Sequence, residues 1–348
     1  MVWQYHNIKL EEVILAGIQE QFSGGIFLYP FDYKSGVVLS MTKVCILSVI
    51  MVGLLGLLVS CASPAEETIP EGGVTDQVGR TVKLYSVPQR IVSLAPSNTE
   101  VLFALGLEDR VVGVTEYCNY PDAASEKEVI GGYSTVDLEK VVSLSPDLIL
   151  ATSMHQDETL PALENRGLKV FVLDPITIDE VLEAIGLVGE VTGKVEEADA
   201  LVGDMEERMA AVTDKTEGLS SEERPRVFFV TWHDPLMTPG SGTRHDEMIE
   251  MAGGVNIAHE LSGYADISLE AVIEANPEVM IAGVGMGSGE DLTAQFMENE
   301  PNLEITAARR SGRLYEMNVD LAGRPGPRIA TAVEEFARFI YPELFGED

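Results

Sequence analysis

The chain has 348 residues, of which 45% are hydrophobic, and a formal net charge of −34 at pH 7. This length allows two domains of ordinary size, and the apolar content allows each of them to bury a core. So acidic a composition argues against nucleic-acid binding and against simple electrostatic adhesion to anionic lipid, because both need a basic surface.

A secretory signal is the first recognisable segment. From Met41 the sequence reads MTKVCILSVIMVGLLGLLVSC, with one lysine, an apolar run and small residues at its end. This order predicts a signal peptide over residues 41–60, with an uncleaved membrane anchor as the alternative. The ending LVSC resembles a bacterial lipobox, which implies that Cys61 is lipidated and that the mature protein is extracytoplasmic. Residues 1–40 precede a complete signal, and we interpret them as a non-native upstream extension.

Residues 61–73 are rich in Pro, Gly, Glu and Ser and are typical of a flexible tether. Beyond Cys61 only Cys118 remains, so we expect no intramolecular disulfide. A small, partly buried apolar side chain is the expected role of Cys118.

Two halves of the remaining chain follow one pattern. In the first, RIVSL (90–94) predicts a strand, Ser97 and Glu100 suggest a capping box for a helix that ends at Gly106, and VVGVT (111–115) predicts another strand. In the second, RVFFV (226–230) predicts a strand, TWHDPLMTPGSG (231–242) a loop, and DEMIEMAGG (246–254) a helix.

A closer repeat follows in each half. DLEKVVSLSPDLILA (137–151) matches SLEAVIEANPEVMIA (268–282) in its Leu-Glu pair, its proline and its apolar positions. Asp137 and Ser268 are good N-cap residues, each proline ends a helix, and each final run predicts a buried strand. Alternating strands and helices predict an α/β fold with two parallel-sheet lobes.

One long helix is expected to join the lobes. Apolar residues recur at helical spacing in KVEEADALVGDMEERMAAV, which would give a stiff connector roughly 30 Å long. We therefore assign residues 74–193 to an N-terminal lobe, 194–222 to the linking helix and 223–348 to a C-terminal lobe, with a ligand cleft between the lobes.

The segment RIVSLAPSNTEVLFALGLEDRVVGVTEYCNYP, the paired Leu-Glu motifs, DPLMTPGSGTRHDEMIEMAGGVNIA and RPGPRI together resemble the substrate-binding proteins of bacterial cobalamin and ferric-siderophore ABC importers. The resemblance covers about Val74 to Leu344 and is nearest to the cobalamin-binding branch. It implies a receptor that captures a corrinoid and delivers it to a permease dimer driven by a separate ATPase. Haem or a ferric siderophore is the alternative ligand.

The same resemblance implies a set of cleft residues. Flat aromatic walls suit a planar macrocycle, while polar side chains would position its substituents. For Trp232, core packing remains an alternative. The candidate ligand-binding residues are Tyr117, Tyr133, Trp232, His233, Tyr264, Asp320 and Arg324.

Glu139 and Glu270 match glutamates that dock on arginines of the permease in that family. A glutamate in a first helical turn also complements the helix dipole, which is the simpler explanation of one such residue. Its presence at the same point of both lobes favours docking onto a two-fold symmetric partner.

Catalysis is not expected. The chain has no G-x-S-x-G elbow and no phosphate-binding G-x-x-x-x-G-K-[ST] loop, and GVGMGSG (283–289) is an incomplete dinucleotide motif. The histidines are scattered, so no metal site is predicted. No cofactor is expected either.

We expect the protein to be a monomer when it is free.

Overall fold

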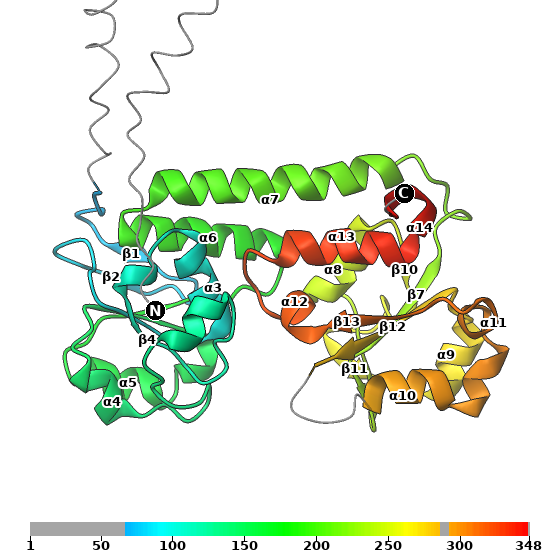
Figure 1. The fold of residues 1–348 in the computed structure, drawn as a ribbon, viewed down its shortest axis with the longest axis horizontal. Helices are drawn as coiled ribbons and strands as arrows, with labels where there is room; N and C mark the ends of the chain where they lie inside the picture. Colours follow the sequence, from blue (N-terminus) through cyan, green and yellow to red (C-terminus); the bar gives the residue numbers. More distant parts are fainter. Residues whose placement is uncertain (1–66, 286–291, 347–348) are drawn as a thin grey trace, which may run out of the picture. The chain divides into compact units, whose positions relative to one another are not determined.

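The computed structural model describes residues 67–285 and 292–346, so the signal segment and Cys61 lie outside the described residues. Two parallel four-stranded sheets form the centres of two lobes within this part of the chain (Figure 1). The predicted α/β class with two parallel-sheet lobes is confirmed. None of the described helices combines the length and the apolar character needed to cross a bilayer.

The sheet of the N-terminal lobe has the strand order β4-β3-β5-β6, and every neighbouring pair is parallel. Alternate residues of each strand enter different apolar clusters: Ile91 and Leu148 face one cluster, Val92 and Ile149 the other. Helices must therefore cover both faces, as is usual for parallel sheets. The elements are β1 (Val74–Thr75), β2 (Thr81–Val82), β3 (Ile91–Ser93), α3 (Pro96–Ala104), η1 (Glu108–Arg110), β4 (Val111–Gly113), η2 (Asp122–Glu126), α4 (Leu138–Ser143), β5 (Leu148–Ala151), η3 (Ser153–His155), α5 (Thr159–Glu164), β6 (Val170–Val172) and α6 (Ile178–Thr192).

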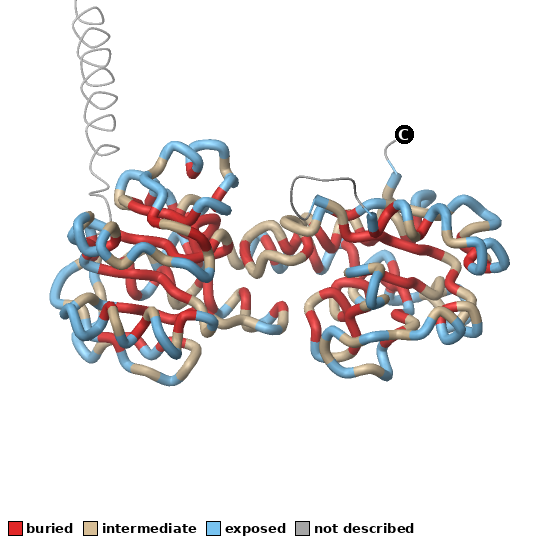
Figure 2. Tube along the Cα trace, turned by 90° about the horizontal axis from the view of Figure 1, so that it is seen from below, coloured by how far each residue is buried: buried red, intermediate tan, exposed pale blue. Residues whose placement is uncertain are grey.

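The C-terminal lobe repeats this topology with the order β10-β7-β12-β13, again all parallel. Val227 and Phe229 face one apolar cluster, Phe228 and Val230 another, and Figure 2 shows the buried residues concentrated inside each lobe. The elements are β7 (Arg226–Val230), β8 (Trp232–His233), β9 (Leu236–Pro239), α8 (Arg244–Met251), β10 (Val255–Asn256), β11 (Tyr264–Asp266), α9 (Leu269–Ala275), β12 (Val279–Val284), α10 (Leu292–Asn299), η4 (Pro301–Ile305), α11 (Ala307–Ser311), β13 (Leu314–Asn318), α12 (Val319–Gly323), α13 (Ile329–Ile340) and α14 (Pro342–Phe345).

The internal repeat extends to a pair of arginines. Arg90, just before β3, donates from Nε to the carbonyl of Leu144 at the end of α4 (2.9 Å). Arg226, at the start of β7, donates from Nε to the carbonyl of Ala275 at the end of α9 (3.0 Å). Each arginine satisfies carbonyl groups that a helix end leaves without an intrahelical partner. The two lobes thus share the same order of strands, and in each lobe an arginine at the central strand binds the end of the short helix.

The long helix α7 (Val195–Thr216) joins the lobes and packs on α6 and α13. Of its predicted apolar stripe, Ala198, Met205, Met209 and Val212 are buried, whereas Val195 is exposed. One apolar cluster therefore runs from the N-terminal sheet through α6, α7 and α13 to the C-terminal sheet. The helix ends at Thr216, short of residue 222, where we expected the linking helix to finish.

Two local expectations are wrong. Ser97 and Glu100 do not form a capping box: α3 starts at Pro96, its N-cap is Ala95, and no side chain caps it. Residues 231–242 are not a simple loop, because β8 and β9 form an antiparallel hairpin in which Trp232 pairs with Met237, and β11 adds to its edge.

Candidate functional site

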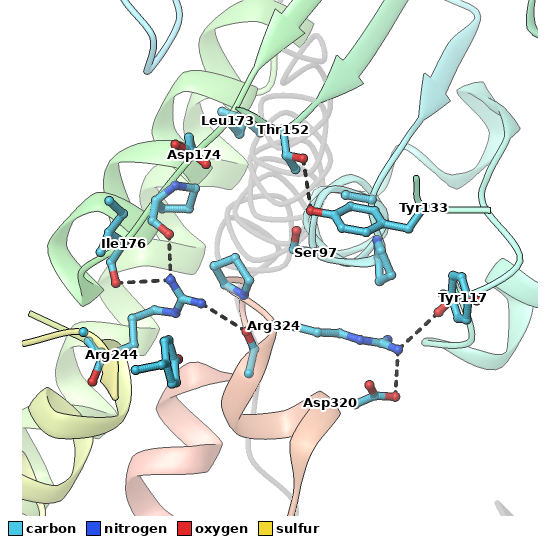
Figure 3. Close-up of a pocket in the computed structure, with 18 of the residues that line it drawn as sticks. Ser97, Tyr117, Tyr133, Thr152, Leu173, Asp174, Ile176, Arg244, Asp320 and Arg324 are labelled. Carbon is cyan, nitrogen blue, oxygen red and sulfur yellow. Dashed lines mark hydrogen bonds and ion pairs between the residues drawn. The ribbon is translucent and has the colours of Figure 1, made fainter. Parts of the chain in front are cut away.

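A cavity of about 730 Å³ lies between the lobes and is lined by residues of both. Its N-terminal wall comes from segments that directly follow strands: Ser97 after β3, Thr152 after β5 and Asp174 after β6. Ligand sites of open parallel sheets usually lie at these carboxyl ends. The volume is within the range of small-molecule sites, so the cavity is the candidate ligand site (Figure 3).

Five of the seven candidate ligand-binding residues line this cavity. They are Tyr117, Tyr133, Tyr264, Asp320 and Arg324. Tyr117 and Tyr264 are about half exposed. Three of the aromatic residues chosen from the sequence, which lie far apart in the chain, thus line the same cavity.

Trp232 and His233 are not among the lining residues of this cavity. The indole of Trp232 is 38% exposed, and its Nε1 donates to the carbonyl of Asp234 within the same turn (2.8 Å). The hairpin formed by β8 and β9 carries both side chains on a separate small sheet. The indole is thus held by its own turn.

Tyr133 is fixed by a buried histidine. Its hydroxyl lies 3.1 Å from Thr152 Oγ1, and its ring meets the edge of the His155 ring at 5.5 Å. His155 Nδ1 accepts from the backbone N–H of Thr152, and Nε2 donates to the carbonyl of Tyr133. Burial lowers the pKa of His155, so the imidazole is neutral, and its two ring nitrogens each make a hydrogen bond that holds the Tyr133 loop beside Thr152.

Tyr264 has a similar partner in the other lobe. Its hydroxyl lies 2.9 Å from Nδ1 of His245, a fully buried residue whose ring also packs on Phe229. Burial, with the nearby positive charge of Arg244, lowers the pKa of His245 to about 3. Partial burial raises the pKa of Tyr264. The phenol therefore stays protonated and shares a hydrogen bond with a neutral imidazole, which fixes the ring.

Arg324 is held by a network that crosses the two lobes. Its Nη1 lies 3.0 Å from Glu100 Oε1 on α3, and its Nη2 lies 2.7 Å from Asp320 Oδ2. Arg328 Nη2 also contacts Glu100 Oε1, at 2.6 Å. The buried carboxylate of Glu100 thus joins the N-terminal lobe to the loop before α13. Arg324 borders the cavity with its charge already neutralised.

A second cation, Arg244, lines the cavity under different conditions. Its Nη1 donates to the carbonyls of Pro175 (2.7 Å) and Ile176 (3.1 Å), and its Nη2 donates to that of Gly323 (3.1 Å). No carboxylate of the described residues forms an ion pair with it. Burial lowers the pKa of this guanidinium, which nevertheless remains charged at neutral pH.

One histidine cluster lies elsewhere in the C-terminal lobe. His259 Nδ1 is 3.0 Å from Asp246 Oδ2 and 3.2 Å from Glu250 Oε1. The spacing of the histidines gave no hint of this group, because residues on α8 and on the loop after β10 form it. Asp246 above all, and then Glu250, raise the pKa of His259, and the ligand atoms of the three side chains lie close enough together to hold a metal ion as well as to form ion pairs.

Glu139 and Glu270 occupy matching places on the surface. Each is the second residue of its helix, α4 or α9, and each is exposed. Asp137 and Ser268 cap these helices by accepting from the backbone N–H of Lys140 and Ala271. The predicted N-caps are thus confirmed. Among the described residues neither glutamate is in an ion pair.

Several contributors to the site were not foreseen. Thr152 and Asp174 directly follow buried strands, so the rule that strand ends carry ligand residues could have selected them. Glu100 acts through Arg324 and Arg328, more than 200 positions away, so no local pattern marks it. His155 and His245 act on Tyr133 and Tyr264, 22 and 19 positions away. Cys118 is buried, as expected, beside the hydroxyl groups of two threonines.

Two similar lobes, one linking helix and a cavity between them define a bilobal substrate-binding protein. Residues 91–321 match the family model described as "Periplasmic binding protein". The chain is 32% identical over 305 residues to the uncharacterized ABC transporter substrate-binding lipoprotein YvrC of Bacillus subtilis, covering 84% of this chain and 95% of that protein. It is also 32% identical to a cobalamin-binding protein of Halobacterium salinarum, covering 80% and 74% of the two chains.

A solved structure agrees with these matches. The periplasmic heme-binding protein RhuT from Roseiflexus sp. RS-1 superposes with a TM-score of 0.65 at 27% identity, covering 73% of this chain and 98% of that one. The chain therefore belongs to the periplasmic binding protein family. It is an extracytoplasmic substrate-binding component of an ABC importer, which works with a membrane permease and an ATPase, and it is not an enzyme.

Proposed function

We propose that this protein captures a corrinoid, either a cobalamin or a precursor, in the cavity between its lobes. The observation that carries the proposal is the meeting of Tyr117, Tyr133 and Tyr264 in the lining of that cavity. Three aromatic side chains from two lobes suit a large, flat ring, for which dispersion and π contact supply most of the affinity. The similarity to a cobalamin-binding protein supports the same ligand class.

The amides of a corrinoid also suit the polar groups of the cavity. Corrin rings carry amide side chains that both donate and accept hydrogen bonds, and Asp174, Thr152 and Ser97 offer acceptors along the N-terminal wall. Haem is the second candidate, favoured by the likeness to a heme-binding structure. A ferric siderophore is the third, and it would call for more basic residues than the two lining arginines.

The direct test is calorimetric titration of the mature domain with cyanocobalamin, dicyanocobinamide, haemin and a ferric hydroxamate. Submicromolar binding of a corrinoid, without binding of the other two classes, is the expected result. Binding of haemin or of the hydroxamate with no response to either corrinoid would contradict the proposal. Calorimetry is preferable to tryptophan fluorescence, because Trp232 does not line the cavity.

Variants connect that binding to the cavity. Tyr133→Ala removes an aromatic wall and should weaken corrinoid binding about two- to tenfold, since an aromatic contact is worth roughly 0.5–1.5 kcal/mol. Tyr85→Ala is a matched control, because the Tyr85 side chain is 94% exposed and does not line the cavity. Equal affinity of the two variants would contradict this location of the site.

We further propose that a lipid at Cys61 anchors the receptor and that Glu139 and Glu270 dock it on the permease. Cys61→Ser should move the protein from the membrane fraction to the soluble fraction of cells that express the full chain. Retention in the membrane fraction would instead favour an uncleaved N-terminal anchor. The residues that mark the signal lie outside the described part of the chain, so the sequence alone supports this step.

A further inference from the structure

Arg244 lines the cavity as a positive charge with no carboxylate partner among the described residues. It is the first residue of α8, and three backbone carbonyls hold its Nη1 and Nη2 atoms (Figure 3). Its Nε is buried and has no hydrogen-bond acceptor within the described chain. Backbone carbonyls orient this guanidinium without neutralising it.

The acidic groups nearest to Arg244 are engaged elsewhere. Asp174 accepts from the hydroxyl of Ser153, Glu180 accepts from the N–H groups at the start of α6, and Glu247 accepts from the N–H of Ile178 (2.7 Å). They act on the guanidinium only at a distance. The contrast with Arg324, which has two carboxylate partners, separates the two cations of the lining.

A partly desolvated cation is stabilised when a bound ligand supplies an opposite charge. We propose that Arg244 forms an anion subsite of the cleft, which takes a phosphodiester or carboxylate group carried by a ring-shaped ligand. This inference rests on the proposed corrinoid function and adds a preference within it. The three carbonyl contacts hold the guanidinium in place, so ligand binding needs little reordering of the side chain.

The subsite distinguishes ligands by their charged groups. Complete cobalamin has a phosphodiester in its nucleotide loop as well as amide side chains, whereas cobinamide has the amides and lacks the phosphate. Haem has two carboxylates and no amides. Arg244 for the anion and the hydroxyl of Ser97 for an amide N–H together fit complete cobalamin best. We therefore expect this receptor to bind complete cobalamin more tightly than cobinamide.

The test compares cyanocobalamin with dicyanocobinamide on wild-type protein and on Arg244→Met, by calorimetric titration. Methionine keeps the unbranched apolar stem of the side chain and removes its charge. We expect the variant to lose about ten- to a hundredfold in affinity for cyanocobalamin, as for loss of one charge-assisted contact, and little for dicyanocobinamide. Arg244→Lys should restore part of the loss. Arg166→Met, at an exposed position on the N-terminal lobe, is the control.

Equal losses for the two corrinoids would overturn the subsite, because Arg244 would then only brace the lobes through its carbonyl contacts. An unchanged affinity for cyanocobalamin would overturn it as well. If wild-type protein binds haemin and no corrinoid, the corrinoid function fails, and a tenfold loss of haemin affinity in Arg244→Met would still support the anion subsite. Binding of neither ligand class to the wild type would overturn both proposals.

Discussion

Arg324 of the C-terminal lobe and Glu100 of the N-terminal lobe form an ion pair of 3.0 Å beside the candidate ligand cavity. The carboxylate of Glu100 is almost wholly buried, with 2% of its side chain exposed, and it also accepts two hydrogen bonds from Arg328. Together with α7 this pairing ties the lobes at a second place. We infer that the lobes open only to a limited extent while the network is intact.

The first prediction concerns Glu100→Gln. The change keeps the shape of the side chain and leaves two partly buried arginines without their shared countercharge. Breaking a buried pair on one side costs about 3–5 kcal/mol, so the free energy of unfolding should fall by that order. Urea unfolding followed by circular dichroism measures the difference. Arg324 would remain paired with Asp320, so the loss in the free energy of unfolding should not exceed this range.

Glu335→Gln is the matched control for that measurement. Glu335 pairs with Arg338 on the same helix, and both side chains are about a third exposed. Such pairs contribute less than about 1 kcal/mol. A loss of stability in Glu100→Gln no larger than that in Glu335→Gln would show that the cross-lobe network contributes little.

The sequence predicts best the features that are encoded locally. The helix-turn-strand repeat predicts α4 with β5 and α9 with β12, because capping residues, prolines and apolar runs act over a few positions. Asp137 and Ser268 cap their helices as expected. The apolar stripe of α7 likewise follows from a spacing of three and four residues.

Longer-range features could not be predicted in this way. Glu100 suggests a capping box with Ser97, yet its carboxylate is bound by Arg324 and Arg328, more than 200 positions away. Trp232 stands after a strand, as a cleft residue would, but it lies in a short hairpin and is not among the residues that line the cavity. The capping-box expectation fails because a tertiary ion pair overrides a valid local pattern, whereas the role of Trp232 as a ligand residue stays a prediction.

A second prediction follows from His245, whose pKa is lowered to about 3 against an ordinary value of 6.5. Between these two pH values the unfolded chain binds a proton that the folded protein excludes. The contribution of neutral His245 to the free energy of unfolding is therefore fully present above about pH 6.5, and it falls as the pH is lowered through this window. His155, with a pKa lowered by burial, acts in the same direction.

Urea unfolding of wild-type protein and of His245→Phe between pH 7.5 and 4.5 tests this dependence. Phenylalanine keeps an aromatic ring against Phe229 and cannot be protonated. The wild type should lose stability more steeply on acidification than the variant, which retains only the contribution of its other groups. Parallel curves would exclude His245 as a source of acid sensitivity.

The third prediction has the opposite sign. Asp246 and Glu250 raise the pKa of His259, so its ion pair contributes stability that is fully present below about pH 6.5 and is lost as the pH rises through the raised value. NMR titration of the imidazole C–H signals should give a pKa above 6.5. Glu250→Gln should lower it, whereas Glu260→Gln, which removes a weaker and more distant charge, should lower it less. A pKa at or below 6.5 in the wild type would contradict the ion-pair assignment.

The last prediction concerns the two exposed glutamates. In Figure 1, α4 and α9 lie on the side of the described structure away from α7, and each presents its glutamate at the same point of the first turn. The double change Glu139→Lys and Glu270→Lys should reduce uptake by the assembled importer at least about tenfold, because like charges at a docking surface cost several kcal/mol. Ligand affinity should not change, since neither residue lines the cavity.

Glu196→Lys with Glu207→Lys provides the matched control. These two exposed acids lie on α7, so the same change in net charge is made on a different surface. Uptake should be retained in the control and lost in the docking variant, with equal affinities by calorimetry. If uptake survives in both, Glu139 and Glu270 serve only their own helices, where an acid in the first turn is worth about 0.3–1 kcal/mol. A matching loss in both would indicate that the acidic surface as a whole guides the receptor to its permease.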